Sequence, residues 1–441
     1  MAIACDKCGI KTEIPEALFK RRKSFRRSFR TECPQCYAKA QLSVLRKNLL
    51  WSLVYGVVGL AIVLIWPDRM SGWLLLNLFF FQLSFIASIL PHEFGHAFAA
   101  RWLGFRVFTV YVGYGKTLFA KNLLGFRTEF RAIPLGGFVL ATPTDANWFR
   151  LKQLTFILAG PIANLALCAI TLLFVPLQEI WDFGGILRGA ALGQALFYTN
   201  LVIFVQSLWP HMFDSPIGKL ANDGKLLLQT LFKKADMIDN ASAARFALEA
   251  MGRYEKHQIA DALNWIDQGL ARLPANFLLL NWRGILLLEQ RQFEAARDCF
   301  KMLLARTDNP PSVRALMLNN IAYVDALLGG SELLHEADLY SQEAISLIGW
   351  LPAVKGTRGT TLLESGKIED ALVLLHESME HADSSSGKAQ NACFISMGEA
   401  RRGNLTESRK YLDEARKLMP ECFLLERATN EFQTAAAKQS V

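Results

Sequence analysis

Long apolar runs dominate the first half of the chain and are absent from the second half. Four stretches contain no charged residue and are long enough to cross about 30 Å of hydrocarbon as helices. They are residues 49–66, 72–91, 153–178 and 189–210. We interpret all four as transmembrane helices, and the second continues as a helix to about residue 96. Between the second and third spans, apolar and polar residues alternate with Gly turns, which predicts a small β-hairpin region.

From about residue 240 onward, the apolar positions follow a helical period and recur at intervals of roughly 34–41 residues. The clearest unit is residues 277–307. A small residue recurs where two helices of each unit cross: Ala262, Ala296, Ala337, Ala371 and Ser408. This pattern predicts about five tetratricopeptide-like helix pairs that stack into a solenoid, and an irregular helical bundle is the alternative. Solenoids of this kind usually bind proteins or peptides, so a protein or peptide partner is expected.

Two CxxC pairs lie near the N-terminus, Cys5 with Cys8 and Cys33 with Cys36, and 24 residues separate the pairs. Four thiolates from two turns are the ligand set of a tetrahedral structural zinc site, so we expect a zinc ribbon. Two disulfides are the alternative, which a reducing cytoplasm disfavours. The remaining cysteines are isolated in helical patterns and are interpreted as small apolar packing residues: Cys168, Cys299, Cys393 and Cys422.

The formal net charge of +8 resides at the N-terminus, because residues 1–48 contain 12 Lys and Arg against 4 Asp and Glu, and the rest of the chain balances. A basic run at residues 20–30 lies just before the first span, which favours contact with anionic lipid over nucleic acid. No nucleic acid partner is expected. The first 48 residues lack the apolar core of a signal peptide, so we expect a cytoplasmic N-terminus. Four spans would return the C-terminal domain to the cytoplasm.

The predicted fold is therefore mainly α. It consists of a polytopic membrane helix bundle of four spans with a small β-hairpin region, an N-terminal zinc ribbon and a C-terminal α-solenoid. The expected domains are a zinc ribbon with a basic cytoplasmic segment (1–47), a membrane-embedded core (48–235) and helical repeats (236–441). A chain of 441 residues is long enough for three domains.

His92, Glu93 and His96 form an HExxH motif at the end of the second span. On a helix, two histidines four residues apart share one face and can bind one zinc ion, while the adjacent Glu can accept a proton from water. Ionisable groups at apolar depth are costly and mark functional sites. The motif predicts a catalytic zinc, and histidines satisfied within a helix bundle are the alternative.

Together with this motif, three segments resemble the site-2 protease family of intramembrane zinc metalloproteases, over roughly residues 72–233. Tyr111–Gly115 is similar to the family's GxG strand, residues 131–139 (RAIPLGGFV) to its "iPlGGyv" segment, and residues 159–164 (AGPIAN) to its "aGPlaN" motif. The resemblance implies a β-hairpin whose open edge pairs with an unwound substrate. A sheet and an Asn that only pack the bundle are the alternative. The substrate-binding residues expected from the resemblance are Gly113, Gly115, Gly136, Gly137 and Asn164.

The family's third zinc ligand is an Asp in a DG motif that follows an "NLLP" turn. Here residues 207–210 (SLWP) occupy the turn, and Asp223-Gly224 follows after a longer loop. We expect Asp223 to be the third ligand, and Asp214 is the alternative because it lies closer to the turn. Ser207 stands where the family has the Asn that polarises the scissile carbonyl. Asn200 and Asn222 are the candidates to replace that Asn.

The resemblance implies a metalloendopeptidase that hydrolyses peptide bonds in or near transmembrane segments of membrane proteins, with Glu93 as general base. It implies one catalytic Zn²⁺ held by His92, His96 and Asp223, beside the structural Zn²⁺ of the ribbon. The expected partners are a transmembrane protein or peptide substrate, the lipid bilayer, and a protein or peptide that regulates the enzyme through the repeats. Two alternatives stay open: a catalytically inactive membrane receptor of the same family, and a membrane-tethered scaffold.

Overall fold

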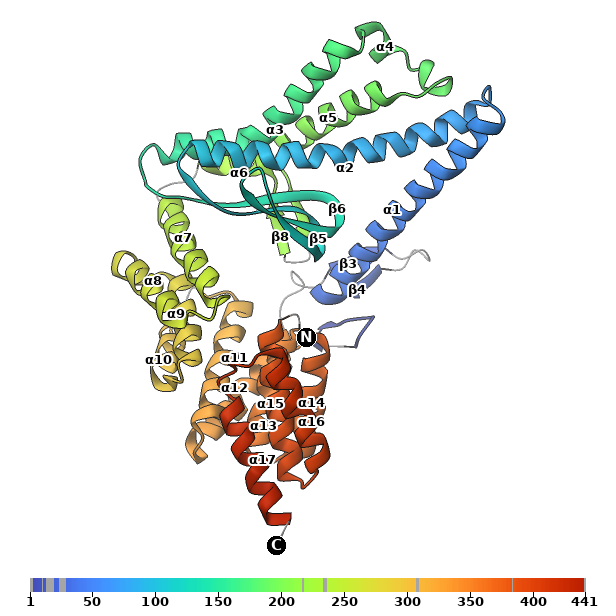
Figure 1. Ribbon diagram of the computed structural model, residues 1–441. Helices are drawn as coiled ribbons and strands as arrows, with labels where there is room; N and C mark the ends of the chain where they lie inside the picture. The colour runs from blue at the N-terminus through green and yellow to red at the C-terminus, as the bar shows by residue number, and fades with distance from the viewer. Residues whose placement is uncertain are drawn as a thin grey trace. The chain divides into compact units, whose positions relative to one another are not determined.

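The computed structural model describes residues 3–9, 11–12, 20–23, 29–215, 218–232, 236–306, 309–382 and 384–439. Arg26 and Arg27 of the basic run lie outside the described residues. The chain divides into two compact units, which are described separately (Figure 1). One unit comprises residues 38–245, and the other comprises residues 1–37 together with residues 246–441.

The first unit is built on long apolar helices. They are α1 (Pro34–Ile65), α2 (Met70–Trp102), α3 (Phe149–Phe174) and α5 (Leu192–Leu208). Among the described residues, three helical segments are long and apolar enough to cross a membrane, namely Leu42–Ile65 of α1, all of α2 and all of α3. The helices α2, α3 and α5 pack against one another, as Figure 1 shows. These three helices bring the sequence motifs of the core to one region.

The last two apolar helices differ from the spans expected at residues 153–178 and 189–210: α3 has the expected length but begins and ends four residues earlier, and α5 is shorter. The helix α3 ends at Phe174 because Pro176 precedes a separate short helix, α4 (Leu177–Trp181). A 3₁₀ turn, η1 (Gly185–Leu187), follows, and α5 has only 17 residues. A helix of 17 residues is about 26 Å long, which lies at the lower limit for crossing hydrocarbon.

The loop before α5 is fixed to α2 by one buried amide. Asn77 is only 1% exposed, and its Nδ2 donates to the carbonyls of Ile186 and Gly189 at 2.7 and 2.8 Å. Its Oδ1 accepts from the Ala191 N–H at 2.9 Å. Three main-chain groups of the loop therefore have hydrogen-bond partners although they are shielded from water. This pairing stabilises the loop where a longer α5 would otherwise extend.

The strands β5 (Phe105–Leu123) and β6 (Phe126–Pro143) form an antiparallel sheet between α2 and α3. Register shifts bend the strands, so residues 110–112 pair with residues 137–139 on one side and with residues 128–130 on the other. Within the described residues, the segment 137–143 pairs along one side only. Its outer edge therefore carries main-chain groups without a strand partner.

The far turn of this sheet is fastened to the end of α2. Leu124 and Gly125 form the turn, and both have positive φ angles. Arg101 donates to the Gly125 carbonyl at 2.6 Å, and its guanidinium lies 3.8 Å from the ring centroid of Phe126. Because Arg101 is in the last turn of α2, these contacts fasten the sheet to the helix that carries the HExxH motif.

After α5 the chain forms a small hairpin, β7 (Met212–Ser215) with β8 (Gly218–Ala221), and then the helix α6 (Asp223–Phe232). The helix α6 packs against α3 and α5. This packing returns the N-terminus of α6 to the bundle that contains the HExxH motif.

The second unit is an array of helix pairs. It begins within α7 (Asp236–Tyr254), which the boundary after residue 245 divides, and continues with α8 (Ile259–Arg272), α9 (Phe277–Glu289), α10 (Phe293–Leu304), α11 (Pro311–Leu328), α12 (Ser331–Ile348), α13 (Pro352–Glu364), α14 (Ile368–His381), α15 (Ser385–Arg401), α16 (Leu405–Leu418) and α17 (Leu425–Gln439). The five small residues expected at the helix crossings, Ala262, Ala296, Ala337, Ala371 and Ser408, are all fully buried. The predicted solenoid of five helix pairs is confirmed, with α17 as an additional last helix.

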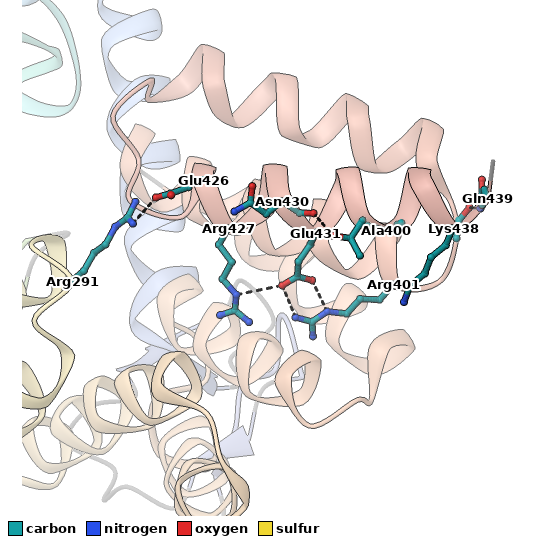
Figure 2. Close-up of a pocket in the computed structure, with 12 residues that line it drawn as sticks. Arg291, Ala400, Arg401, Glu426, Arg427, Asn430, Glu431, Lys438 and Gln439 are labelled. Carbon is teal, nitrogen blue, oxygen red and sulfur yellow. Dashed lines mark hydrogen bonds and ion pairs between the residues drawn. The ribbon is translucent and has the colours of Figure 1, made fainter. Parts of the chain in front are cut away.

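The last helix closes the array through ion pairs, which Figure 2 shows. Arg401 of α15 makes a bidentate contact with Glu431 of α17, at 2.8 and 2.9 Å, and Arg427 lies 3.3 Å from the same carboxylate. Arg427 also donates to Glu364 of α13 at 2.6 Å. A cavity of about 610 Å³ lies beside these residues, and the arginines that line it already have carboxylate partners. These ion pairs hold the last helix on the array.

The N-terminal residues belong to the repeat unit. Four short strands form two antiparallel pairs, β1 (Ile3–Ala4) with β2 (Lys11–Thr12) and β3 (Lys20–Lys23) with β4 (Phe29–Glu32). Cys5 and Cys33 are buried in one apolar cluster with Ala315 and Leu318 of α11 and Ile348 of α12. Residues 1–37 therefore group with the repeats, and the domain boundary expected at residue 47 stays a prediction.

Candidate metal centre

The HExxH motif lies within α2 and directs its polar side chains into the first unit. The exposed fraction is 4% for Glu93 and 6% for His96, and 11% for the His92 side chain. The Nε2 atoms of the two histidines lie 3.2 Å apart. The i, i+4 spacing thus brings the two ring nitrogens to one point, as the sequence predicted.

A chain of amides fixes the orientation of His92. The Asn200 amide donates to the Leu196 carbonyl at 2.8 Å, which leaves its Oδ1 to accept from Asn164 at 2.7 Å. Asn164 Oδ1 then faces His92 Nδ1 at 2.6 Å. Because that oxygen can only accept, His92 carries its proton on Nδ1 and presents a lone pair at Nε2.

His96 is fixed in the same sense by the main chain of α3. Its Nδ1 lies 2.8 Å from the Phe156 carbonyl, which can only accept, so Nε2 again presents a lone pair. The ring also lies directly against Gly160. A Cβ atom at Gly160 would stand 2.2 Å from His96 Nε2, so only glycine leaves room for the ring.

Asp223 joins the two histidines from α6. Its Oδ2 lies 3.2 Å from His92 Nε2, and its Oδ1 lies 3.6 Å from His96 Nε2. The backbone of Asp214, the alternative candidate, lies in β7 opposite Lys219, and its side chain is outside the described part of the chain. Among the described side chains, Asp223 is the carboxylate that converges on the histidine pair.

The long loop before Asp223 is closed by the residue that precedes it. The amide nitrogen of Asn222 donates to the carbonyls of Gln206, Ser207 and Trp209, at 2.7–3.0 Å. Its Oδ1 accepts from the His211 N–H at 3.0 Å. His211 and Asn222 therefore lie side by side, and the β7–β8 hairpin between them accounts for the extra length. The long segment between Pro210 and Asp223 therefore does not move Asp223 away from the end of α5.

The three groups fit a metal ion. Zinc–nitrogen distances of about 2.0–2.1 Å at tetrahedral angles imply ligand atoms about 3.3 Å apart, close to the observed separations of 3.2–3.6 Å. Two nitrogen lone pairs and a carboxylate facing one another at these distances repel unless a cation lies between them. His92, His96 and Asp223 together form a group able to hold such an ion.

A cavity of about 490 Å³ opens next to this group. Glu93 lines it beside Gly137 of the sheet edge, where a Cβ atom would stand 2.7 Å from Glu93 Cγ. Tyr114 lines it as well, and burial, followed by the nearby charge of Glu93, raises the pKa of Tyr114 to about 12. Its hydroxyl therefore stays protonated and can donate a hydrogen bond into the cavity.

The other expected substrate-binding residues divide into two groups. Gly136 and Gly137 line the cavity, and Gly113 and Gly115 have positive φ angles at the bend of the facing strand. Asn164, in contrast, is fully buried, and its hydrogen bonds go to His92, Asn200 and the Ser88 carbonyl. Asn164 thus contacts a histidine and is not among the residues that line the cavity, and its part in substrate binding stays a prediction.

Neither amide proposed to replace the missing Asn at position 207 points freely into the cavity. Asn200 is fully buried in the His92 network, and Asn222 uses its amide group to close the loop. The Ser207 hydroxyl donates to the Phe204 carbonyl at 3.0 Å.

Sequence reasoning missed Tyr114, although this residue stands between the two glycines of the GxG segment. It also missed Phe156, which acts through its main-chain carbonyl and leaves no side-chain signal.

The four ribbon cysteines form a second group of ligand atoms. All four Sγ atoms lie within 4.8 Å of one another, and Cys8 and Cys33 are 3.8 Å apart at sulfur. Zinc–sulfur distances of about 2.3 Å at tetrahedral angles imply sulfur atoms about 3.8 Å apart. The eight cysteines are all free thiols. This group also fits a zinc ion.

Comparison with known proteins gives a family match across most of the chain. The model of peptidase family M50 matches residues 80–391. The zinc metalloprotease Rip1 of Mycobacterium tuberculosis is 30% identical over 118 residues, which cover 23% of this chain and 28% of that protein. Rip1 of Mycolicibacterium smegmatis is 35% identical over 103 residues, covering 19% and 25% of the two chains. The match thus spans less than a third of the length of either relative.

Among solved structures, a tetratricopeptide repeat protein of Thermus thermophilus aligns with 43% of this chain and 99% of its own length. The alignment has a TM-score of 0.35 and 16% sequence identity. The assignment of the second unit as helix pairs follows from its own helices and buried crossing residues.

Proposed function

Because the chain belongs to peptidase family M50, we propose that it is an intramembrane zinc metalloendopeptidase that cleaves peptide bonds in or near transmembrane segments of membrane proteins. The observation that carries this proposal is the convergence of His92, His96 and Asp223 beside a cavity lined by Glu93. The relatives named as zinc metalloproteases support zinc as the metal. The three ionisable groups of α2 lie in an apolar helix, where such groups are retained for function.

In this proposal, His92, His96 and Asp223 would hold a zinc ion, which would supply Lewis-acid activation of water and of the scissile carbonyl. Glu93 accepts a proton from the attacking water and donates it to the leaving amine. Asn164 and the Phe156 carbonyl keep both histidines in the tautomer that presents Nε2. Tyr114 donates a hydrogen bond to the developing oxyanion, in place of the family's Asn.

The substrate is proposed to bind as an extended strand along the outer edge of residues 137–143. That edge has unpaired main-chain groups, and Gly137 brings it against Glu93 without an intervening side chain. A helical substrate has its carbonyls hydrogen bonded, so it must unwind before the cut, and pairing with the edge replaces the hydrogen bonds lost. Substrates with helix-weakening residues near the cut are therefore favoured.

The arrangement in the membrane follows from the same proposal. If α5 crosses the bilayer as a fourth span, the ribbon and the repeats are both cytoplasmic. This topology agrees with the repeats and the ribbon forming one unit, since parts in contact lie on one side of the membrane. The ribbon would then hold a structural zinc, and the repeats would bind a cytoplasmic protein or peptide that regulates cleavage.

The proposal is tested by cleavage of a model transmembrane substrate in proteoliposomes. The full chain should cut the substrate within its span, lose activity on treatment with a membrane-permeant zinc chelator, and regain it with added Zn²⁺. Cleavage that persists after removal of zinc from the His92 site would contradict the mechanism.

An inactive receptor is the second candidate, and the orientation of Ser207 favours it. The Ser207 hydroxyl is bonded to its own helix and supplies no donor to the cavity. A preparation with zinc at both sites that cleaves no substrate with a weakened helix would support this receptor over the enzyme.

A further inference from the structure

The cavity beside the metal centre has one part of its wall to which the mechanism above gives no role. Ile203, Gln206 and Ser207 of α5 line this part, and spacings of three and four residues place them on one face of the helix. Val202 and Val205, on the other side of α5, are 48% and 53% exposed. The face of α5 that carries Gln206 is therefore turned toward the cavity.

The carboxamide of Gln206 is not engaged in the fold. Within the part of the chain that the structure describes, its side chain makes no hydrogen bond. The neighbouring polar groups are engaged: the Ser207 hydroxyl donates to the Phe204 carbonyl, and the Asn222 amide closes the loop that follows α5. Gln206 thus presents a donor and an acceptor that are both unused.

The backbone of Gln206 is fixed beside the metal centre. Its carbonyl accepts from the Asn222 amide nitrogen at 3.0 Å, and Asn222 directly precedes Asp223. Glu93 lines the same cavity. The Gln206 side chain therefore extends from a fixed backbone into the space where a bound substrate would lie, and it does so without being one of the metal ligands.

An extended substrate needs hydrogen-bond partners on two sides. Its successive residues direct their N–H and C=O groups alternately to the two sides of the strand, and the outer edge of residues 137–143 can pair with one side only. The groups on the other side would be shielded from water inside an apolar bundle, where each unpaired peptide group is costly. Gln206 offers the donor and the acceptor that one residue of the substrate requires.

We propose that Gln206 binds the main chain of the substrate on the side of the extended segment that faces away from the sheet edge. Its carboxamide accepts from the N–H and donates to the C=O of one substrate residue near the cleaved bond. Gln206 stands one residue before the SLWP turn, outside the motifs that resemble the family, so the resemblance does not imply this contact. The inference rests on the proposed function, from which it takes the extended substrate.

The test measures binding of a synthetic transmembrane peptide with a Gly-rich centre. The protein is the full chain in nanodiscs with zinc, and it carries Glu93→Gln so that cleavage is suppressed. In a series of peptides, one central peptide group at a time is replaced by an ester, which lacks the N–H donor and has a weaker acceptor. Adding Gln206→Met should weaken binding of the all-amide peptide about tenfold.

The ester series distinguishes a contact from a general structural effect. In the Glu93→Gln protein, the ester at the position facing Gln206 should weaken binding about tenfold, and with Gln206→Met added this ester should cost nothing. Esters that face the sheet edge should keep their cost in both proteins. Ser207→Ala is the matched control, because its hydroxyl is bonded within its own helix, and it should leave affinity and the ester pattern unchanged.

Two results would overturn the contact while zinc content is retained. One is unchanged binding with Gln206→Met, and the other is weaker binding in which every ester keeps its cost. Absence of binding by every peptide would overturn it as well. Cleavage by the chain without Glu93→Gln is measured in parallel. Cleavage with an ester pattern that ignores Gln206 would refute this contact alone, whereas the expected pattern without cleavage would contradict the proposed enzyme and leave the contact standing.

Discussion

At the scale of single residues, the centre depends on which nitrogen of each histidine faces inward. The HExxH motif and the DG segment can be recognised in the sequence because their side chains are themselves the proposed metal ligands and proton acceptor. The partners that orient them are harder to recognise. Asn164 was visible as part of a motif but its contact with His92 was not, Asn200 was one of two candidate amides, and the Phe156 carbonyl has no signature in a sequence. Hydrogen bonds to the main chain depend on how α2 and α3 pack.

Replacement of Asn164 by Ala should weaken zinc binding about 10–100-fold, because His92 loses the partner that fixes its tautomer. The measurement is competition against a zinc chelator. Asn77→Ala is the matched control, since Asn77 is an equally buried amide in α2 whose bonds go to the loop before α5. Equal losses in the two variants would point to general destabilisation and against an orienting role.

Gly137→Ala should reduce cleavage about 100-fold or more while zinc content is retained. The new Cβ would stand 2.4 Å from the Tyr111 carbonyl and 2.7 Å from Glu93 Cγ, so the sheet edge and Glu93 cannot keep their positions, and displacements of this size are costly for catalysis. Gly189→Ala has open space around it and serves as the control. Wild-type turnover by Gly137→Ala would mean that the edge does not approach Glu93.

At the scale of elements, apolar length predicted the helices well, and their ends less well. The second span continues as one helix through HExxH to Trp102, whereas α3 ends before Pro176 and the loop bound by Asn77 shortens α5. The spacing from Pro210 to Asp223 looked too long for the family pattern. The sequence contains no indication that His211 and Asn222 are bonded, so it could not show that a hairpin absorbs the difference.

Replacing residues 213–220 by two glycines should leave the zinc content of the His92 site unchanged. Met212 and Ala221 are cross-strand partners, which a two-residue turn can join, and the bond between His211 and Asn222 remains. Asn222→Ala should lower zinc content instead, because it opens the loop that positions Asp223. Metal analysis of both purified proteins distinguishes them, and loss of zinc in the shortened loop would show that the hairpin itself holds Asp223.

At the scale of the whole molecule, composition separated the apolar half from the repeats, and the recurrence of small residues identified the helix pairs. The position of the ribbon could not be predicted. Its docking depends on apolar side chains of α11 and α12, such as Leu318 and Ile348, that any solenoid would bury somewhere. A sequence pattern identifies which residues avoid water and does not identify what covers them.

A double variant, Cys5→Ser with Cys33→Ser, should contain about one zinc ion per chain where the wild type contains about two. The catalytic site lies in the other unit, so cleavage in detergent should persist. Cys168→Ser with Cys299→Ser removes two isolated, buried cysteines and should leave the zinc ratio unchanged. An unchanged ratio in the Cys5 and Cys33 variant would exclude the structural zinc.

The most direct test of the central claim is cleavage of a transmembrane substrate by Glu93→Gln, measured together with zinc content. The substitution keeps the size of the side chain and all three proposed zinc ligands, and it removes the proton acceptor. We expect zinc to stay bound and turnover to fall by about 10²–10⁴-fold or more. His92→Ala should lose the zinc of this site as well as the activity. Equal cleavage by the wild type and Glu93→Gln would contradict the account of this protein as a metalloprotease that uses Glu93.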